Sequence, residues 1–249
     1  MLEVEGSKRV KSFRKMICDM PNFVENEPAD LEAFFSALSK YSSCKAKFDE
    51  SVDACFLLNI DPKKGDNAVK TVCVLPHGNG RQVNVLVFAE GEMAKKAKEL
   101  GAKYVGSDDI VEDIIAGRIN ISELSACIAT QDLMPRVAKT KVAQILGRAG
   151  LMPNIKLGTV AADITRVLKE TLAGRVSVKA DKFAAVKCSI GRISFSEDKL
   201  KENLYALYNS LKAAKPAAVK GSFFGSLHLS STMMGASFNI KMSNLYNNA

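Results

Sequence analysis

The sequence predicts an α/β protein in two parts, and three observations support this. Residues 83–150 alternate short apolar runs with amphipathic ones, which is typical of strand–helix repeats in a layered fold. Residues 159–249 combine the alternation of strands with one long amphipathic helix. At the junction, residues 146–160 contain the breakers Gly147, Gly150, Pro153 and Gly158. This junction is either an ordinary surface loop or a hinge between domains.

The sequence pattern of the N-terminal part predicts two helices followed by two strands. Residues 8–20 form a short basic amphipathic pattern, and Pro28 suits the first turn of a helix whose apolar stripe is Leu31, Phe34, Phe35 and Leu38. Alternation predicts strands over residues 48–60 and 69–75. The second strand ends in the turn Pro76–Gly80. This turn lacks the P-loop spacing, so a hairpin or interdomain turn is favoured over a phosphate loop.

The middle part predicts a layered sheet. Strands are expected at residues 83–88, 103–105 and 126–130, and helices at 92–100, from Ser107 onward and at 132–146. Asp108, Asp109 and Glu112 fall in the first turn of the second helix, where the helix dipole explains them better than an acid–base site. No GxGxxG follows the first strand, so nothing indicates dinucleotide binding.

The C-terminal part predicts two helices and four strands. We expect a helix at residues 163–172, strands at 175–178 and 186–190, and a helix from Ser196 to just before Pro216. Strands at residues 221–231 and 237–242 complete the chain.

Composition excludes several classes of protein. At 47% hydrophobic and 25% charged residues, the 249-residue chain is typical of a soluble globular protein of one or two domains. No apolar run approaches the roughly 20 residues that span a bilayer, and the basic N-terminus carries acids and lacks an apolar signal core. We therefore expect no membrane partner and no targeting segment.

The cysteines and histidines limit the kinds of metal and catalytic site that the chain can form. The six cysteines form no CxxC pair, which predicts buried free thiols, and only His77 and His228 could help hold zinc. We expect no metal, no cofactor and no catalytic residue.

The net charge of +8 is concentrated in residues 159–249, with 13 Lys and Arg against 6 Asp and Glu. The counts are 11 against 12 in residues 1–76 and 11 against 9 in residues 77–158. Such an excess suggests a polyanionic partner.

Several segments, in order along nearly the whole chain, resemble one family. They are AKFDESVD (46–53), IDPKKGDNAVK (60–70), VLPHGNG (74–80), GAKYVGSDD (101–109), LGRAGLMPN (146–154), GRISFSEDKLKENL (191–204), AAKPAAVKG (213–221) and LSSTMMG (229–235). The sequence is similar to the bacterial-type L-one family of large-subunit ribosomal proteins, which builds the mobile stalk beside the exit site.

The resemblance implies an architecture. A split α+β domain is made from both termini, here residues 1–76 and 159–249, with a Rossmann-like three-layer α/β domain inserted as residues 77–158. The implied hinge residues are Pro76, Gly78, Pro153 and Gly158.

The resemblance also implies a non-catalytic, rRNA-binding function. The split domain clamps large-subunit rRNA, with Lys47, Phe48 and Ser51 facing Thr232, Met233 and Gly235, and with Lys182, Lys187 and Arg192 as peripheral phosphate contacts. The inserted domain swings with the stalk and helps deacylated tRNA leave the exit site. Members of the family in bacteria also repress translation of their own mRNA.

Three departures from the family pattern are expected to matter. Met234 adds a residue to the RNA-binding loop, so the loop and the contact of Gly235 are expected to change. The turn at residues 181–184 is bulkier than usual. Two prolines are missing from residues 146–159, which predicts a less stiff hinge strand.

Two other functions remain as alternatives. One is a non-ribosomal RNA-binding chaperone of the same fold, and the other is a small α/β enzyme that uses a nucleotide, for which the sequence offers neither a phosphate loop nor a reactive residue. The expected location is the ribosome of the bacterial cytoplasm, with the mitochondrial ribosome as the alternative.

Overall fold

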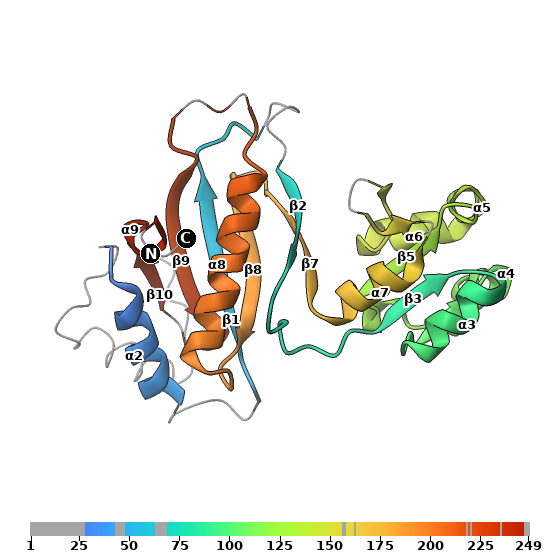
Figure 1. Cartoon of the computed structure of the whole chain (residues 1–249), viewed down its shortest axis with the longest axis horizontal. Helices are drawn as coiled ribbons and strands as arrows, with labels where there is room; N and C mark the ends of the chain where they lie inside the picture. Colours follow the sequence, from blue (N-terminus) through green and yellow to red (C-terminus); the bar gives the residue numbers. More distant parts are fainter. Residues whose placement is uncertain are drawn as a thin grey trace, which may run out of the picture. The chain divides into compact units, whose positions relative to one another are not determined.

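The computed structural model divides the chain into two compact units (Figure 1). Unit 1 is Met1–Gly80 with Ser177–Ala249, and unit 2 is Arg81–Val176. The structure describes residues 28–42, 48–62, 69–155, 158–161, 163–217, 219, 221–234 and 236–246. The predicted helix at residues 8–20 lies outside these ranges. Both chain ends belong to unit 1, so the chain passes between the units twice.

Unit 1 is built on a four-stranded antiparallel sheet of order β10-β9-β1-β8. Its strands are β1 (Ser51–Leu58), β8 (Ala185–Arg192), β9 (Phe224–Ser231) and β10 (Ser237–Ile240). Along β1, every second residue from Val52 to Leu58 is buried, which is the alternation that the sequence predicts. The other residues of β1 are at least partly exposed.

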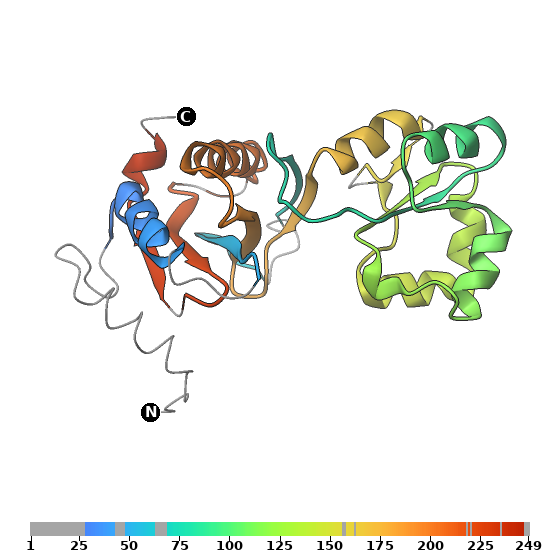
Figure 2. The same cartoon turned by 90° about the horizontal axis from the view of Figure 1, so that it is seen from below.

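Two helices cover one face of this sheet (Figure 2): α2 (Leu31–Ser42) and α8 (Glu197–Ala213). The Phe34 ring of α2 lies edge-on to Phe238 at 5.5 Å between centroids. The Tyr208 ring of α8 lies 4.8 Å from that of Phe224. The apolar stripes predicted for both helices therefore form the core of unit 1.

A separate two-stranded sheet pairs β2 (Lys70–Val74) with β7 (Arg175–Lys179). At the chain's end, the strand expected over residues 237–242 is shorter than predicted. It stops at Ile240 because the chain turns there into a short helix, α9 (Ser243–Tyr246), whose Leu245 is buried.

Unit 2 contains a parallel sheet of order β4-β3-β5-β6 with helices on both faces. The strands are β3 (Val85–Phe88), β4 (Tyr104–Gly106), β5 (Ala126–Thr130) and β6 (Val160–Ala161). The helices are α3 (Gly91–Glu99), α4 (Asp108–Ile115), η2 (Ile121–Glu123), α5 (Met134–Lys139), α6 (Lys141–Ala149) and α7 (Ile164–Leu172).

Alternate residues of β3 show why this unit has three layers. Leu86 and Phe88 pack in the cluster that contains α4, α5 and α6, whereas Val85 and Val87 pack in the cluster that contains α3 and α7. All four residues are buried, as expected for a parallel strand covered on both faces. The Rossmann-like three-layer arrangement predicted for the inserted domain is therefore present.

The sequence places the second domain boundary too early. The division falls at Val176/Ser177, whereas the expected boundary was 158/159. The physical reason is that β6 pairs in parallel with β5, and α7 buries Ile164 and Leu168 against the same sheet. Both elements therefore belong to unit 2. The first boundary differs less, at Gly80/Arg81 against the expected 76/77.

The prediction of a single helix at residues 132–146 is also wrong, because the structure has the two helices α5 and α6 there. Thr140 has extended backbone angles, φ −89° and ψ 163°, and separates α5 from α6. Its hydroxyl donates to the Val137 carbonyl at 2.8 Å, a local bond of the kind that competes with the helical pattern.

Within the described ranges, no helix combines the length and apolarity that a bilayer crossing requires. The four cysteines in these ranges are free, and they are Cys55, Cys73, Cys127 and Cys188.

These thiols are expected to differ in reactivity. Burial raises the pKa of Cys127 to about 12 and that of Cys188 to about 12, so at pH 8 almost no nucleophilic thiolate forms at either. Cys55 is only partly buried. Among these four residues, iodoacetamide should therefore modify Cys55 first in the native protein, as read from peptide masses, and should modify all four at similar rates in urea. Equal native rates at Cys55 and Cys127 would contradict this assignment.

Candidate nucleic-acid interface

The antiparallel topology of unit 1 brings three distant segments together. Because β1 runs antiparallel to both neighbours, its start lies beside the ends of β8 and β9. Ser51 is paired with Arg192 on β8, and Val52 with Ser231 on β9. The residues gathered here, called the strand-end patch below, are Phe48, Ser51, Arg192, Thr232 and Met233.

Hydrogen bonds fix the centre of this patch. The hydroxyl oxygens of Ser51 and Thr232 are 2.9 Å apart, and the Thr232 N–H donates to the Ser51 carbonyl at 3.2 Å. The Ser51 hydroxyl also lies 3.2 Å from a carboxylate oxygen of Asp53. The two hydroxyls are thus held side by side although they come from opposite ends of the sequence.

A buried carboxylate holds the strand-end patch in place. Glu50 is fully buried and accepts hydrogen bonds from the Ser231 hydroxyl at 2.7 Å and the Met233 N–H at 3.0 Å. Its own carbonyl accepts from the Ile193 N–H at 3.0 Å. Glu50 therefore ties the starts and ends of all three strands together.

Arg192 and Asp49 hold the segment that precedes β1. The Arg192 guanidinium donates to the Asp49 carbonyl at 2.6 Å, and the Asp49 carboxylate accepts from the Ser194 hydroxyl at 2.8 Å. Beside this anchored segment, Phe48 is 51% exposed, and across the patch Met233 is 43% exposed. Two large apolar side chains thus face solvent next to paired hydroxyls.

Met234 is buried completely, unlike its neighbour Met233. Its N–H closes the turn by donating to the Ser231 carbonyl at 3.4 Å. The additional residue noted in the sequence thus packs into the core of unit 1. Lys47 and Gly235, both expected at this interface, lie outside the described residues.

Lys182 and Lys187 do not join the strand-end patch. Lys187 pairs with Cys55 in the middle of β1, whereas Arg192 pairs with Ser51 at its start. Lys182 lies in the turn before β8, farther still along the strand direction. These two lysines therefore form a separate basic region.

The first hinge segment is attached to unit 1 through Asn203 of α8, which is fully buried. Its side-chain oxygen accepts from the His77 N–H at 3.1 Å, and its amide donates to the carbonyls of Gly78 and Ile190 at 2.9 and 2.8 Å. The His77 ring also lies 2.6 Å from the Glu202 carboxylate. Pro76 and Gly78 thus belong to an anchored turn that precedes the crossing at Gly80/Arg81.

Pro153 and Gly158 do not lie at the second crossing. Both belong to unit 2, where the Gly158 N–H donates to the Ile155 carbonyl at 2.9 Å. Thr159 closes the same turn through its hydroxyl, which accepts from the Asn154 N–H at 2.7 Å. Of the two positions at which the family has a proline, Ile155 lies in this turn and Arg148 lies in the last turn of α6, so both lost prolines affect unit 2.

Gly80 is expected to tolerate alanine poorly. Its φ of +70° disfavours an L side chain, and a Cβ there would lie 2.7 Å from Cγ of Arg192 and 3.3 Å from the Phe195 ring. Gly80→Ala should lower the free energy of unfolding by about 2–3 kcal/mol in urea, through the φ penalty plus displacement of Arg192. Gly221→Ala is the control, because φ is +89° there and the space is open. Equal losses for both variants would show that the contact is unimportant.

Unit 2 gives no support to a nucleotide site. Its strand order reverses between β3 and β5, where parallel α/β sheets usually bind ligands. Glu90 stands at the N-cap of α3 at this edge and pairs with Arg136 at 3.4 Å. A carboxylate at that position repels a phosphate. Among the described residues, no three His, Cys, Asp or Glu side chains form a possible metal site.

Sequence reasoning missed Glu50 and Asn203. A signal for Glu50 was available, since it falls in phase with the buried positions that begin at Val52. An acid in phase with core residues indicates a buried, hydrogen-bonded carboxylate.

Comparison with known proteins identifies the family of this chain. The model of a family described as Ribosomal protein L1p/L10e matches residues 38–234. A Thiobacillus denitrificans protein named large ribosomal subunit protein uL1 is 48% identical over 191 residues, or 77% of this chain and 80% of that protein. A protein of the same name from Coxiella burnetii is 46% identical over 189 residues, or 76% of this chain and 79% of that protein. The chain belongs to the ribosomal protein L1p/L10e family.

Proposed function

We propose that this chain is a non-catalytic constituent of the large ribosomal subunit that binds large-subunit rRNA through the strand-end patch. The observation that carries the proposal is the paired hydroxyls of Ser51 and Thr232, flanked by exposed Phe48 and Met233. The names of the relatives support the ribosomal part of the proposal.

The chemistry of the patch suits folded RNA. Proteins recognise such RNA by its shape, its 2′-hydroxyls and its phosphates, and by stacking on unpaired bases. The hydroxyls of Ser51 and Thr232 can donate to and accept from ribose, and Phe48 can cover a base or sugar face. Arg192 supplies positive charge at the same place. The buried Glu50 holds these groups in position before RNA binds.

Three finer roles follow from the resemblance to the family. Unit 2 belongs to the mobile stalk and helps deacylated tRNA leave the exit site, and the chain also represses translation of its own mRNA by binding an rRNA-like structure in it. We place the protein in the bacterial cytoplasm, on the ribosome, because the relatives described above come from bacteria.

Reconstitution with large subunits that lack this protein tests the proposal. Wild-type protein should cosediment at one copy per subunit, and Phe48→Ala and Thr232→Ala should each reduce the bound fraction at equal protein concentration. Ile155→Ala is the control, because Ile155 is an exposed apolar residue of unit 2. A wild-type protein that binds RNA but does not cosediment would favour the non-ribosomal RNA-binding alternative.

A further inference from the structure

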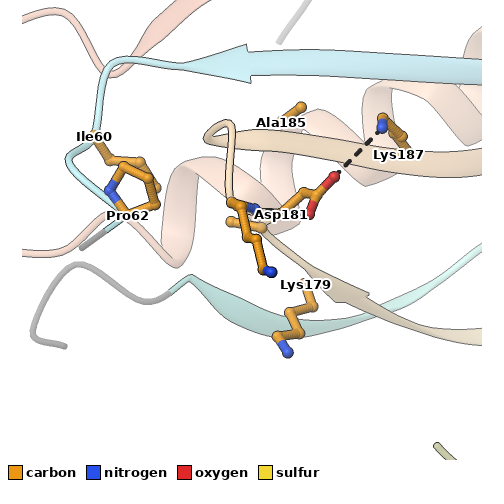
Figure 3. A pocket seen from close by; sticks show the side chains of 8 residues that line it. Ile60, Pro62, Lys179, Asp181, Ala185 and Lys187 are labelled. Carbon is orange, nitrogen blue, oxygen red and sulfur yellow. Dashed lines mark hydrogen bonds and ion pairs between the residues drawn. The ribbon is translucent and has the colours of Figure 1, made fainter. Parts of the chain in front are cut away.

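A basic pocket lies in unit 1, away from the strand-end patch, where β7 turns into β8 (Figure 3). Its volume is about 500 Å³. Three lysines and one acid line it, together with apolar atoms of the segment after β1. The lining residues are Ile60, Pro62, Lys179, Ala180, Asp181, Lys182, Ala185 and Lys187.

The turn that forms one side of the pocket is well fixed. The Asp181 carboxylate accepts from the Lys182 N–H at 2.7 Å, and the Asp181 carbonyl accepts from the Ala184 N–H at 3.0 Å. The Asp181 N–H donates in turn to the Ala185 carbonyl at 2.8 Å. Ala184 has φ of 59°, the only positive φ at a non-glycine residue in the described ranges. Such a backbone persists only where its surroundings hold it.

The pocket carries more positive than negative charge. The Lys182 N–H and the Lys187 ammonium, which lies 3.5 Å from the carboxylate, hold the pKa of Asp181 below its usual value. The one acid is therefore ionised and already compensated. Across the described ranges, the ammonium groups of Lys179 and Lys182 come within ion-pair distance of no carboxylate. They are suited to a partner that brings its own negative charge.

An exposed aromatic ring stands in the same turn. Phe183 lies between Lys182 and Ala184, and it is 80% exposed, more than any other large hydrophobic residue described. Burial of such a ring requires a partner, because the fold of unit 1 does not cover it. Aromatic rings beside lysines are the combination with which proteins hold single-stranded nucleic acid.

We propose that Phe183 and this lysine-lined pocket form a second RNA contact, which holds one unpaired nucleotide. Phe183 stacks on the base, and Lys179 and Lys182 bind the adjoining phosphate. The inference rests on the proposed rRNA-binding function and adds a second point of attachment on the same unit. Because Lys187 and Ser51 pair at different positions along β1 and β8, the two contacts engage different nucleotides.

Affinity measurements with the full chain and a stalk fragment of large-subunit rRNA test this. Phe183→Ala should weaken binding by roughly 5- to 150-fold, the effect of losing one stacked base, whereas Phe183→Trp should retain wild-type affinity. Lys182→Ala should reduce the slope of log affinity against log salt by about 0.7. Lys199→Ala, on the exposed surface of α8, should leave that slope unchanged.

The outcomes separate this inference from the proposed function. If wild type binds and Phe48→Ala weakens binding but Phe183→Ala does not, the second contact is refuted and the first stands. If Phe183→Ala leaves RNA affinity unchanged yet lowers incorporation into large subunits, the ring contacts a protein, and the inference is equally overturned. If wild type itself does not bind the fragment, the proposed function fails first.

Discussion

Glu50→Ala is expected to lower the free energy of unfolding of unit 1 by about 2–5 kcal/mol. The Ser231 hydroxyl would lose its acceptor at a buried position, and the Met233 N–H would lose its acceptor at a partly buried one. Because these donors begin the turn that carries Thr232, binding to the stalk fragment should fall together with stability. Urea unfolding followed by circular dichroism measures the first effect, and RNA affinity measures the second.

A control must separate lost stability from a displaced turn. Leu207→Ala removes a fully buried side chain of α8 and should destabilise unit 1 by a similar 2–5 kcal/mol. At a temperature where both variants remain folded, Leu207→Ala should bind RNA like wild type and Glu50→Ala should not. Equal RNA affinities would show that Glu50 does not position the patch.

Asn203→Leu is expected to destabilise unit 1 by about 2–4 kcal/mol. The substitution removes three hydrogen bonds at once and leaves two carbonyls and one N–H of neighbouring segments without their partner. It should also release the segment Leu75–Gly80 from α8. Native-state hydrogen exchange should then show faster exchange at the His77 amide, because that N–H donates to Asn203.

Asn203→Asp gives a closely matched comparison. An aspartate keeps the oxygen that accepts from the His77 N–H, but it loses both donated bonds and places a carboxylate against two carbonyls. Stability should fall in both variants, whereas the His77 amide should remain protected in Asn203→Asp alone. Equal protection of this amide in both variants would mean that another group holds the hinge segment.

The fold was most predictable where each residue's environment depends on nearby sequence. The strand at residues 126–130 has the predicted bounds, because a parallel strand buried on both faces gives a continuous apolar run. The break at Thr140 was missed because a single side-chain bond to Val137 decides it. The domain boundary was misplaced because the pairing of β6 with β5 joins segments distant in sequence.

The surface residues of the candidate site could be predicted from the sequence, whereas the buried residues that hold them in position could not. Phe48, Ser51, Thr232 and Met233 lie together in the structure, but that expectation came from resemblance to a family and not from local pattern. Glu50 reaches Ser231 across 181 residues of sequence, and Asn203 reaches His77 across 126. Contacts at such separations are set by the fold, so residue patterns alone give little indication of them.

The measurement that most directly tests the central claim is binding of the full chain to a stalk fragment of large-subunit rRNA and to an unrelated structured RNA, across a salt series. The account predicts tight binding to the stalk fragment that persists at moderate salt, weakened by Phe48→Ala and by Thr232→Ala, with weak binding to the unrelated RNA. Equal and steeply salt-dependent binding to both RNAs would contradict it, because affinity would then arise from the net charge of +8 and not from the strand-end patch.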